Sequence, residues 1–126
     1  MSNNRDILYQ VLQYVMAVTD GKFADLSVTT LAYSFNIDRF KLSRQCKRRL
    51  GMTLQDFLFK EKMTRAAFLL KGQGDMTVKE VSERIGFCTC DYFIRKFKGY
   101  YGVAPGRYKE LKTTSTAIHA GNQPEV

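Results

Sequence analysis

Residues 86–109 read GFCTCDYFIRKFKGYYGVAPGRYK, and the rest of the chain is interpreted outward from this stretch. Thr89 is a good N-cap residue and Gly102 a good helix stop, so the pattern predicts a helix of about a dozen residues between them. Phe93 and Phe97 lie four residues apart on one face of that helix, whereas the opposite face is basic. Such a helix, preceded by a tight turn and another short helix, is typical of a helix-turn-helix unit. The alternative is a surface helix that is basic without a binding role.

The first half of the chain repeats this pattern. Before the turn, six residues match residues fifty positions later, namely Ser27, Val28, Leu31, Phe35, Asn36 and Ile37 with Thr77, Val78, Val81, Ile85, Gly86 and Phe87. After the turn the offset is 51, and the matches are Asp38, Leu42, Arg44, Cys46, Lys47 and Gly51 with Thr89, Phe93, Arg95, Phe97, Lys98 and Gly102. Because caps, core positions, turn and basic face match together, the sequence predicts two copies of one unit.

The sequence predicts an all-α protein with about seven helices and a division into four parts. These parts are a first helix-turn-helix subdomain over residues 1–52, a linker helix over 53–72, a second helix-turn-helix subdomain over 73–112 and a disordered C-terminal tail over 113–126. The apolar residues of the linker helix are spread widely enough to face two partners. We therefore expect it to be a rigid rod that joins both units.

A first helix is predicted near the N-terminus, capped by Asn3 or Asn4 and closed by Gly21. Its apolar residues recur at helical spacing and are expected to share one face, namely Ile7, Leu8, Val11, Leu12, Val15 and Met16. We interpret this helix as scaffold. A dimer zipper is the weaker alternative, because the stripe lasts only about three turns.

Thr53 and Asp56 resemble a capping box at the start of the linker helix.

Composition limits the class of partner. The chain has 126 residues, of which 44% are hydrophobic and 13% aromatic, so it can bury a core. Its formal net charge of +8 favours nucleic acid, ahead of an anionic membrane, as the partner. No apolar run approaches the length of a membrane span, and the N-terminal residues MSNNRDIL lack the apolar segment of a signal peptide. Three cysteines suggest no disulfide framework, so a reducing cytoplasm is expected.

Residue types that carry catalysis are scarce. The single histidine, His119, lies in the predicted tail, and Cys88-Thr89-Cys90 is one C-x-C with no second pair for a zinc site. No glycine-rich loop could cradle a phosphate. The sequence therefore predicts a protein that is not an enzyme and needs no metal or cofactor. Two alternatives stay open, a protein-interaction module of a bacterial regulatory complex and a regulator that senses redox state through Cys88 or Cys90.

The second half of the chain carries the signature GF-x-(S/T)-x-x-x-F-x-R-x-FK-x-x-x-G-x-x-P-x-x-Y, formed here by Gly86-Phe87, Thr89, Phe93, Arg95, Phe97-Lys98, Gly102, Pro105 and Tyr108. With this signature, residues 5–112 resemble the DNA-binding domain of the AraC/XylS family of bacterial transcription regulators. The chain departs from the usual family pattern at Gln45 and Cys46, where an apolar residue and Phe are common, and at Cys90 and Asp91, where polar base-reading residues are common.

The resemblance implies a homeodomain-like three-helix unit in each half and activation or repression of transcription, often through contact with RNA polymerase. It also implies a bacterial protein of the cytoplasm, associated with the nucleoid. The family usually carries a separate effector or dimerisation domain, and none is expected in this sequence, which therefore resembles either the short members of the family or a fragment of a longer regulator. We therefore expect a monomer, or a dimer only through a domain outside this chain.

Double-stranded DNA is the expected partner, because a helix fits the major groove and reaches base edges there. The residues expected to read bases are Arg39, Phe40, Ser43 and Arg44 in the first unit and Cys90, Asp91, Ile94 and Arg95 in the second. Those expected to hold phosphates are Lys41, Lys47, Arg48, Lys96 and Lys98. Two linked units imply two successive major-groove segments, about 34 Å apart. Backbone contact without base reading is the alternative for Arg44 and Arg95, and a plain surface aliphatic is the alternative for Ile94.

Overall fold

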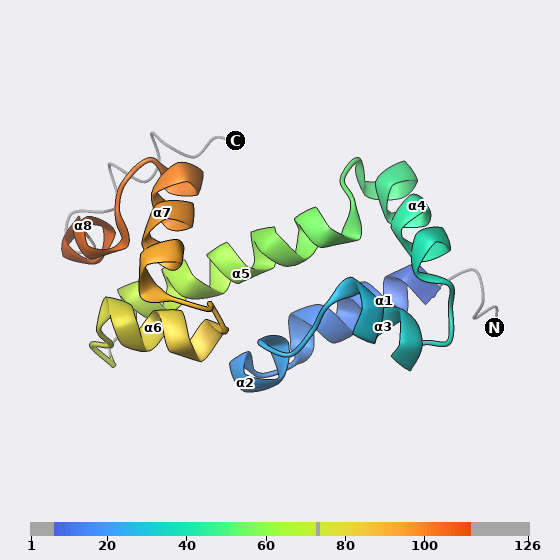
Figure 1. The fold of residues 1–126 in the computed structure, drawn as a ribbon, viewed down its shortest axis with the longest axis horizontal. Coiled ribbons are helices and arrows are strands. Elements are labelled where there is room, and N and C mark those ends of the chain that lie inside the picture. The colour runs from blue at the N-terminus through green and yellow to red at the C-terminus, as the bar shows by residue number, and fades with distance from the viewer. Residues whose placement is uncertain (1–6, 73, 112–126) are drawn as a thin grey trace. The chain divides into compact units, whose positions relative to one another are not determined.

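The computed structural model describes residues 7–72 and 74–111, and every regular element within them is helical (Figure 1). The all-α prediction is therefore confirmed. The chain divides into two compact units, with the boundary between Lys62 and Met63. The predicted cap at Asn3 or Asn4 and the predicted tail over residues 113–126 lie outside the described residues.

The residues before the boundary form unit 1, whose complete helices are α1 (Ile7–Ala17), α2 (Asp20–Phe23), α3 (Val28–Ser34) and α4 (Arg39–Leu50). The boundary falls within helix α5 (Leu54–Lys71). The residues after it form unit 2, whose further helices are α6 (Val78–Ile85), α7 (Cys90–Tyr101) and α8 (Pro105–Glu110). Thr53, the predicted cap of α5, accepts a hydrogen bond from the backbone N–H of Asp56 at 3.1 Å.

The described residues thus hold eight helices rather than about seven, and the additional one is α2. Thr19 starts this helix, because its hydroxyl oxygen accepts a hydrogen bond from the backbone N–H of Lys22 at 3.4 Å. The expectation that Gly21 closes the first helix is wrong. Helix α1 already ends at Ala17, and Gly21 lies inside α2.

The two units start their helices with the same local chemistry. In each case the side-chain oxygen of the N-cap residue accepts a hydrogen bond from the backbone N–H three residues later. The pairs are Ser27–Thr30 (3.1 Å), Asp38–Lys41 (2.9 Å), Thr77–Glu80 (3.0 Å) and Thr89–Tyr92 (3.1 Å). These four residues are the N-caps that the repeat predicts, so the starts of α3, α4, α6 and α7 are confirmed.

The turn between the two helices of each unit also closes identically. The backbone N–H of Ile37 donates to the carbonyl of Ala32, and that of Phe87 donates to the carbonyl of Ser82, each at 3.0 Å. The residue before each donor, an asparagine in unit 1 and a glycine in unit 2, is in the left-handed region with φ of +55° and +95°. Glycine adopts this conformation freely and asparagine tolerates it, which explains why these two residue types stand at the turn.

In unit 1, α4 packs against α1 and α3 (Figure 1). The fully buried side chains include Val11 and Val15 of α1, Leu31 of α3, and Leu42 and Cys46 of α4. The predicted inward face of α1 is wrong at one position, because Met16 is 59% exposed. The buried stripe of α1 is narrower than the apolar sequence pattern and consists of Leu8, Val11 and Val15.

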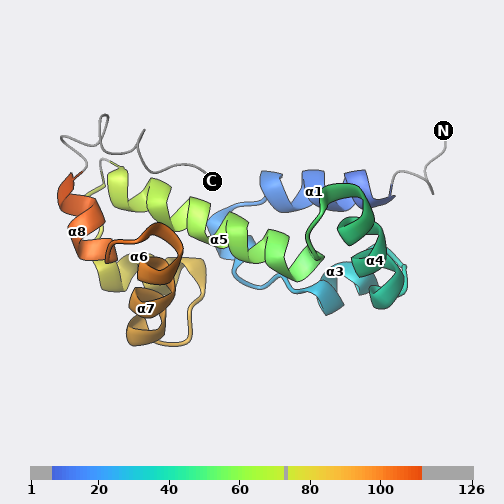
Figure 2. The same cartoon turned by 90° about the horizontal axis from the view of Figure 1, so that it is seen from above.

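In unit 2, α7 packs against α6 and α8 (Figure 2). Phe93 and Phe97 of α7 are fully buried, with their ring centroids 5.6 Å apart. The ring of Phe97 also lies 5.3 Å from that of Tyr108 and 4.6 Å from that of Tyr101. Burial raises the pKa of Tyr101, and electrostatic interaction with Tyr108 and Tyr100 raises it further. The neutral hydroxyl of Tyr101 donates a hydrogen bond to the carbonyl of Met63 at 3.2 Å.

We predict that Phe97→Ala lowers the free energy of unfolding by about 3–5 kcal/mol, because it leaves a cavity among the aromatic rings of unit 2. Urea denaturation followed by circular dichroism measures this change. Ile94→Ala is the matched control on the same helix, since Ile94 is 36% exposed and should cost much less. Equal losses for the two variants would contradict the assignment of Phe97 to the core.

Candidate nucleic-acid interface

One face of α4 and one face of α7 are committed to the cores of their units. Leu42 and Cys46 of α4 are fully buried, and so are Phe93 and Phe97 at the matching positions of α7. In a helix, residues four positions apart share a face, so most side chains at other positions point outward, although Tyr101 of α7 packs against Phe97. The sequence-predicted contact residues lie on these outward faces.

The outward face of α4 is strongly basic. Six basic side chains of this helix are exposed, namely Arg39, Lys41, Arg44, Lys47, Arg48 and Arg49. The helix contains no acidic residue, since Asp38 lies one position before it as the N-cap. Phe40 is 59% exposed, whereas Ser43 is only partly exposed. A surface with this charge density attracts a polyanion such as the DNA backbone.

Arg39 is held by two neighbours. Its Nη1 donates a hydrogen bond to the hydroxyl of Thr29 on α3 at 3.2 Å, and its guanidinium lies 4.8 Å from the centroid of the Phe40 ring. The structure therefore brings two predicted base-reading residues, Arg39 and Phe40, into contact. The hydrogen bond from Arg39 to Thr29 was not predicted from the sequence. It depends on how α3 crosses α4, which the sequence pattern of either helix does not reveal.

The outward face of α7 carries fewer charges. Arg95, Lys96 and Lys98 are exposed, and Asp91, which is also exposed, is the only acidic residue of this helix. Ile94 is 36% exposed, and Cys90 is partly exposed at the start of the helix. The predicted contact residues of unit 2 are therefore accessible, with Cys90 the least so.

Tyr92 is a residue of this surface that the sequence interpretation missed. Its ring centroid lies 5.5 Å from the guanidinium carbon of Arg95 and 5.5 Å from the ammonium nitrogen of Lys96. These distances are within the range of cation–π attraction. A usable signal was present in the sequence, because residues three and four positions apart are neighbours on a helix surface.

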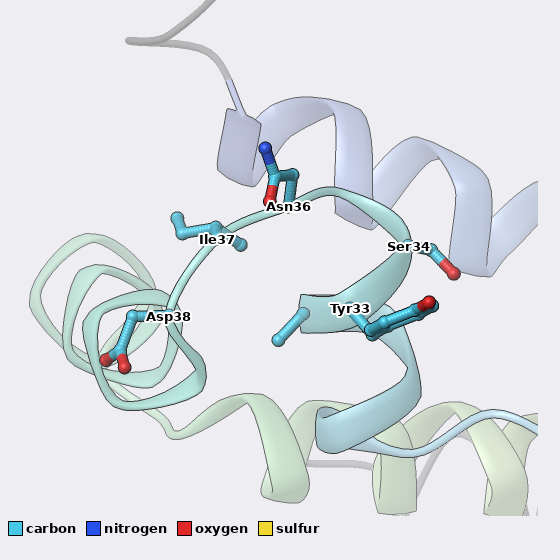
Figure 3. Close-up of a pocket in the computed structure, with 6 residues that line it drawn as sticks. Tyr33, Ser34, Asn36, Ile37 and Asp38 are labelled. Carbon is cyan, nitrogen blue, oxygen red and sulfur yellow. The ribbon is translucent and has the colours of Figure 1, made fainter.

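The described residues offer little for other chemistry. Among residues 7–72 and 74–111, no group of three or more histidine, cysteine, aspartate or glutamate side chains could hold a metal ion. In the same part of the chain, no helix is long and apolar enough to cross a membrane. An open hollow of about 740 Å³ lies at the turn of unit 1, beside Tyr33, Asn36 and Ile37 (Figure 3). Its one charged lining residue, Asp38, already caps α4.

Two helix-turn-helix units, each with an exposed basic second helix, define the class of this protein as a DNA-binding domain with a duplicated reading unit. Comparison with protein families supports this class, because residues 31–111 match the family described as "Helix-turn-helix domain". The chain belongs to this family, the helix-turn-helix domains of the AraC type. The family suggested by the sequence signature is thereby confirmed.

Curated relatives are similar along most of this chain. It is 35% identical over 106 residues to an uncharacterized HTH-type transcriptional regulator, YfiF, of Bacillus subtilis, which covers 81% of this chain and 33% of that protein. It is 28% identical over 96 residues to the HTH-type transcriptional regulator MtrA of Neisseria gonorrhoeae, covering 76% of this chain and 32% of the relative. The chain thus spans about a third of the length of these relatives.

Solved structures share the fold. The C-terminal domain of AraT, a response regulator from Geobacillus stearothermophilus, superimposes with a TM-score of 0.74 at 31% identity, covering 83% of this chain and 84% of that one. The DNA-binding domain of the transcriptional factor AdpA, solved in complex with a target DNA, has a TM-score of 0.74 at 22% identity. That match covers 87% of this chain and 96% of the AdpA domain, and at this identity it shows a common fold.

The three cysteines differ in accessibility, and we predict that they differ in reactivity. Cys46 is fully buried and burial raises the pKa of its thiol, whereas Cys88 is exposed and Cys90 is partly exposed. Iodoacetamide should therefore alkylate Cys88 first, then Cys90, and should reach Cys46 only after denaturation. Peptide mapping by mass spectrometry measures the order. Alkylation of Cys46 in the folded protein as fast as that of Cys88 would show that the core of unit 1 is not packed as described.

Proposed function

We propose that this chain binds double-stranded DNA in a sequence-specific manner as the reading part of a transcription regulator, with α4 and α7 entering successive major-groove segments. One observation carries the proposal. In both units, the helix after the turn buries one face in its core and presents exposed cations on the other. This is the arrangement in which a helix can lie in the groove while the rest of the unit holds its orientation.

In unit 1, Arg44 is proposed to bind guanine O6 and N7 with two parallel hydrogen bonds, the commonest specific contact in the major groove. The neighbouring Arg39, Phe40 and Ser43 complete the reading surface, with Phe40 placed to contact a thymine methyl group. Support comes from the exposure of Phe40 and both arginines and from the contact that fixes Arg39 over the Phe40 ring.

In unit 2, the proposed reading residues are Cys90, Asp91, Ile94 and Arg95. Arg95 matches Arg44 in the repeat and is given the same role towards guanine. Asp91 repels phosphates, so it either accepts a hydrogen bond from cytosine N4 or stays out of contact. Ile94 adds an apolar contact surface for a thymine methyl group.

Phosphate contacts are assigned to Lys41, Lys47, Arg48, Lys96 and Lys98, all of which are exposed. Such contacts fix the register of a protein on DNA without reading its sequence. They also release counterions, so the affinity depends steeply on salt. If α5 is stiff between the units, the DNA must bend to accept both reading helices.

Several properties of the complete regulator extend this proposal. A single chain carries both reading units, so a monomer can recognise an asymmetric site without a palindrome, and any dimer forms through a domain outside this chain. The protein acts by binding rather than by catalysis, on DNA of the bacterial cytoplasm at the nucleoid. It regulates transcription through contact with RNA polymerase.

Selection of bound sites from random duplex DNA tests base reading. We predict an enriched sequence with two conserved blocks about one helical turn, or 10 base pairs, apart. Arg44→Ala should relax one block and Arg95→Ala the other, because each removes a contact worth about 1–3 kcal/mol of discrimination. Arg49→Ala is the matched control, since it removes an exposed cation of α4 without an assigned base contact. A block that stays unchanged in the arginine variant assigned to it would refute that base-reading role.

Salt titration tests the phosphate contacts. We predict that the affinity falls steeply between 50 and 200 mM salt, and that Lys47→Gln reduces the slope of log K against log[salt] by about 0.9. Fluorescence anisotropy with a labelled duplex measures both quantities, and Lys22→Gln, which alters an exposed lysine of α2, is the control that should keep the slope. An affinity that does not change with salt would favour a protein partner instead of DNA.

A further inference from the structure

Tyr92 contacts the body of unit 2 through its backbone and its ring. Its backbone N–H donates to the hydroxyl of Thr89 at 3.1 Å, and its ring centroid lies 6.1 Å from that of Phe87. Phe87 is only 8% exposed, and its ring centroid lies 4.8 Å from that of the fully buried Phe93. The Tyr92 ring therefore rests on an aromatic layer that continues into the core.

The same ring also lies near two of the cations of α7. Arg95 and Lys96 each place their charge 5.5 Å from the ring centroid, and Tyr92 itself remains 39% exposed. The negative face of an aromatic ring attracts cations, so the ring restricts two side chains that would otherwise sample many rotamers. Both restricted side chains belong to the proposed DNA-binding surface.

Helix α4 has no aromatic residue at the position that matches Tyr92. The residue that matches Tyr92 in the repeat is Lys41, itself a cation. The exposed ring of α4 is Phe40, and it holds Arg39, which is the residue before it. The exposed ring of α4 therefore lies near the first residue of that helix, whereas the ring of Tyr92 lies near residues of the second turn of α7.

We propose that Tyr92 is a positioning residue for DNA recognition by unit 2, which holds Arg95 ready for a guanine edge and Lys96 ready for a phosphate. The inference rests on the proposed function and adds a residue to it. Ordering long side chains costs free energy when a complex forms, and side chains that are already restricted lose less. The planar guanidinium of Arg95 gains most, because bidentate contact requires one orientation.

The experiment measures the affinity of the whole chain for its selected duplex and for a duplex with an altered second block. Tyr92→Leu should weaken binding to the selected duplex about threefold to tenfold and reduce discrimination against the altered block. Tyr92→Phe keeps the ring and should bind nearly as the unaltered chain does. Tyr9→Leu on α1 is the control for loss of an exposed tyrosine, since Tyr9 is 58% exposed and lies outside the reading helices.

A second measurement separates positioning from a general loss of structure. In a chain that already carries Arg95→Ala and Lys96→Ala, the further change Tyr92→Leu should alter the affinity by less than about twofold, because no cation remains to be positioned. The inference is overturned if Tyr92→Leu causes the same loss in both backgrounds, or if it leaves affinity and discrimination intact. Failure of the proposed function is distinguishable, because Arg95→Ala itself would then leave the preference for the second block unchanged.

Discussion

The burial of one face of α4 and one face of α7 is the constraint on which the rest of this structure depends. Leu42 and Cys46 in unit 1, and Phe93 and Phe97 in unit 2, are fully enclosed. Helical geometry relates the direction of each side chain to that of its neighbours, so the buried positions decide which residues each helix can offer to a ligand. The cationic surface is therefore a consequence of core packing as much as of composition.

Local chemistry explains why much of the fold could be predicted from the sequence. An N-cap such as Thr89 acts within three residues, and a turn residue such as Gly86 acts through its own backbone conformation. Such signals are readable without knowledge of neighbouring helices. The duplication strengthened them, because the same cap, turn and stop chemistry occurs in both units.

The features that were missed depend on contacts or on weak local signals. Helix α2 is a single short helix of four residues, which periodicity cannot detect. Met16 fits the apolar period of α1 but is exposed, because only the narrower face formed by Leu8, Val11 and Val15 is buried. Thr29 of α3 accepts a hydrogen bond from Arg39 of α4, and the ring of Tyr92 lies near two cations of its own helix. The burial of Cys46, by contrast, was predicted, because the repeat matches it with Phe97.

The two units differ in chemistry although they share one design. Helix α4 offers six exposed basic residues and no acid, whereas α7 offers three basic residues, an exposed aspartate and two exposed tyrosines, Tyr92 and Tyr100. We infer that unit 1 supplies more of the attraction to phosphates, and that unit 2 relies more on side chains held in place by an aromatic ring. Unequal units suit an asymmetric DNA site.

The central claim is that one chain uses both units on one DNA molecule. Hydroxyl-radical footprinting on a selected duplex, combined with the binding stoichiometry from analytical ultracentrifugation, tests it most directly. Our account predicts one chain per duplex and two protected segments on the same face of the DNA, separated by about one helical turn. A single protected segment, or two chains on each duplex, would contradict it.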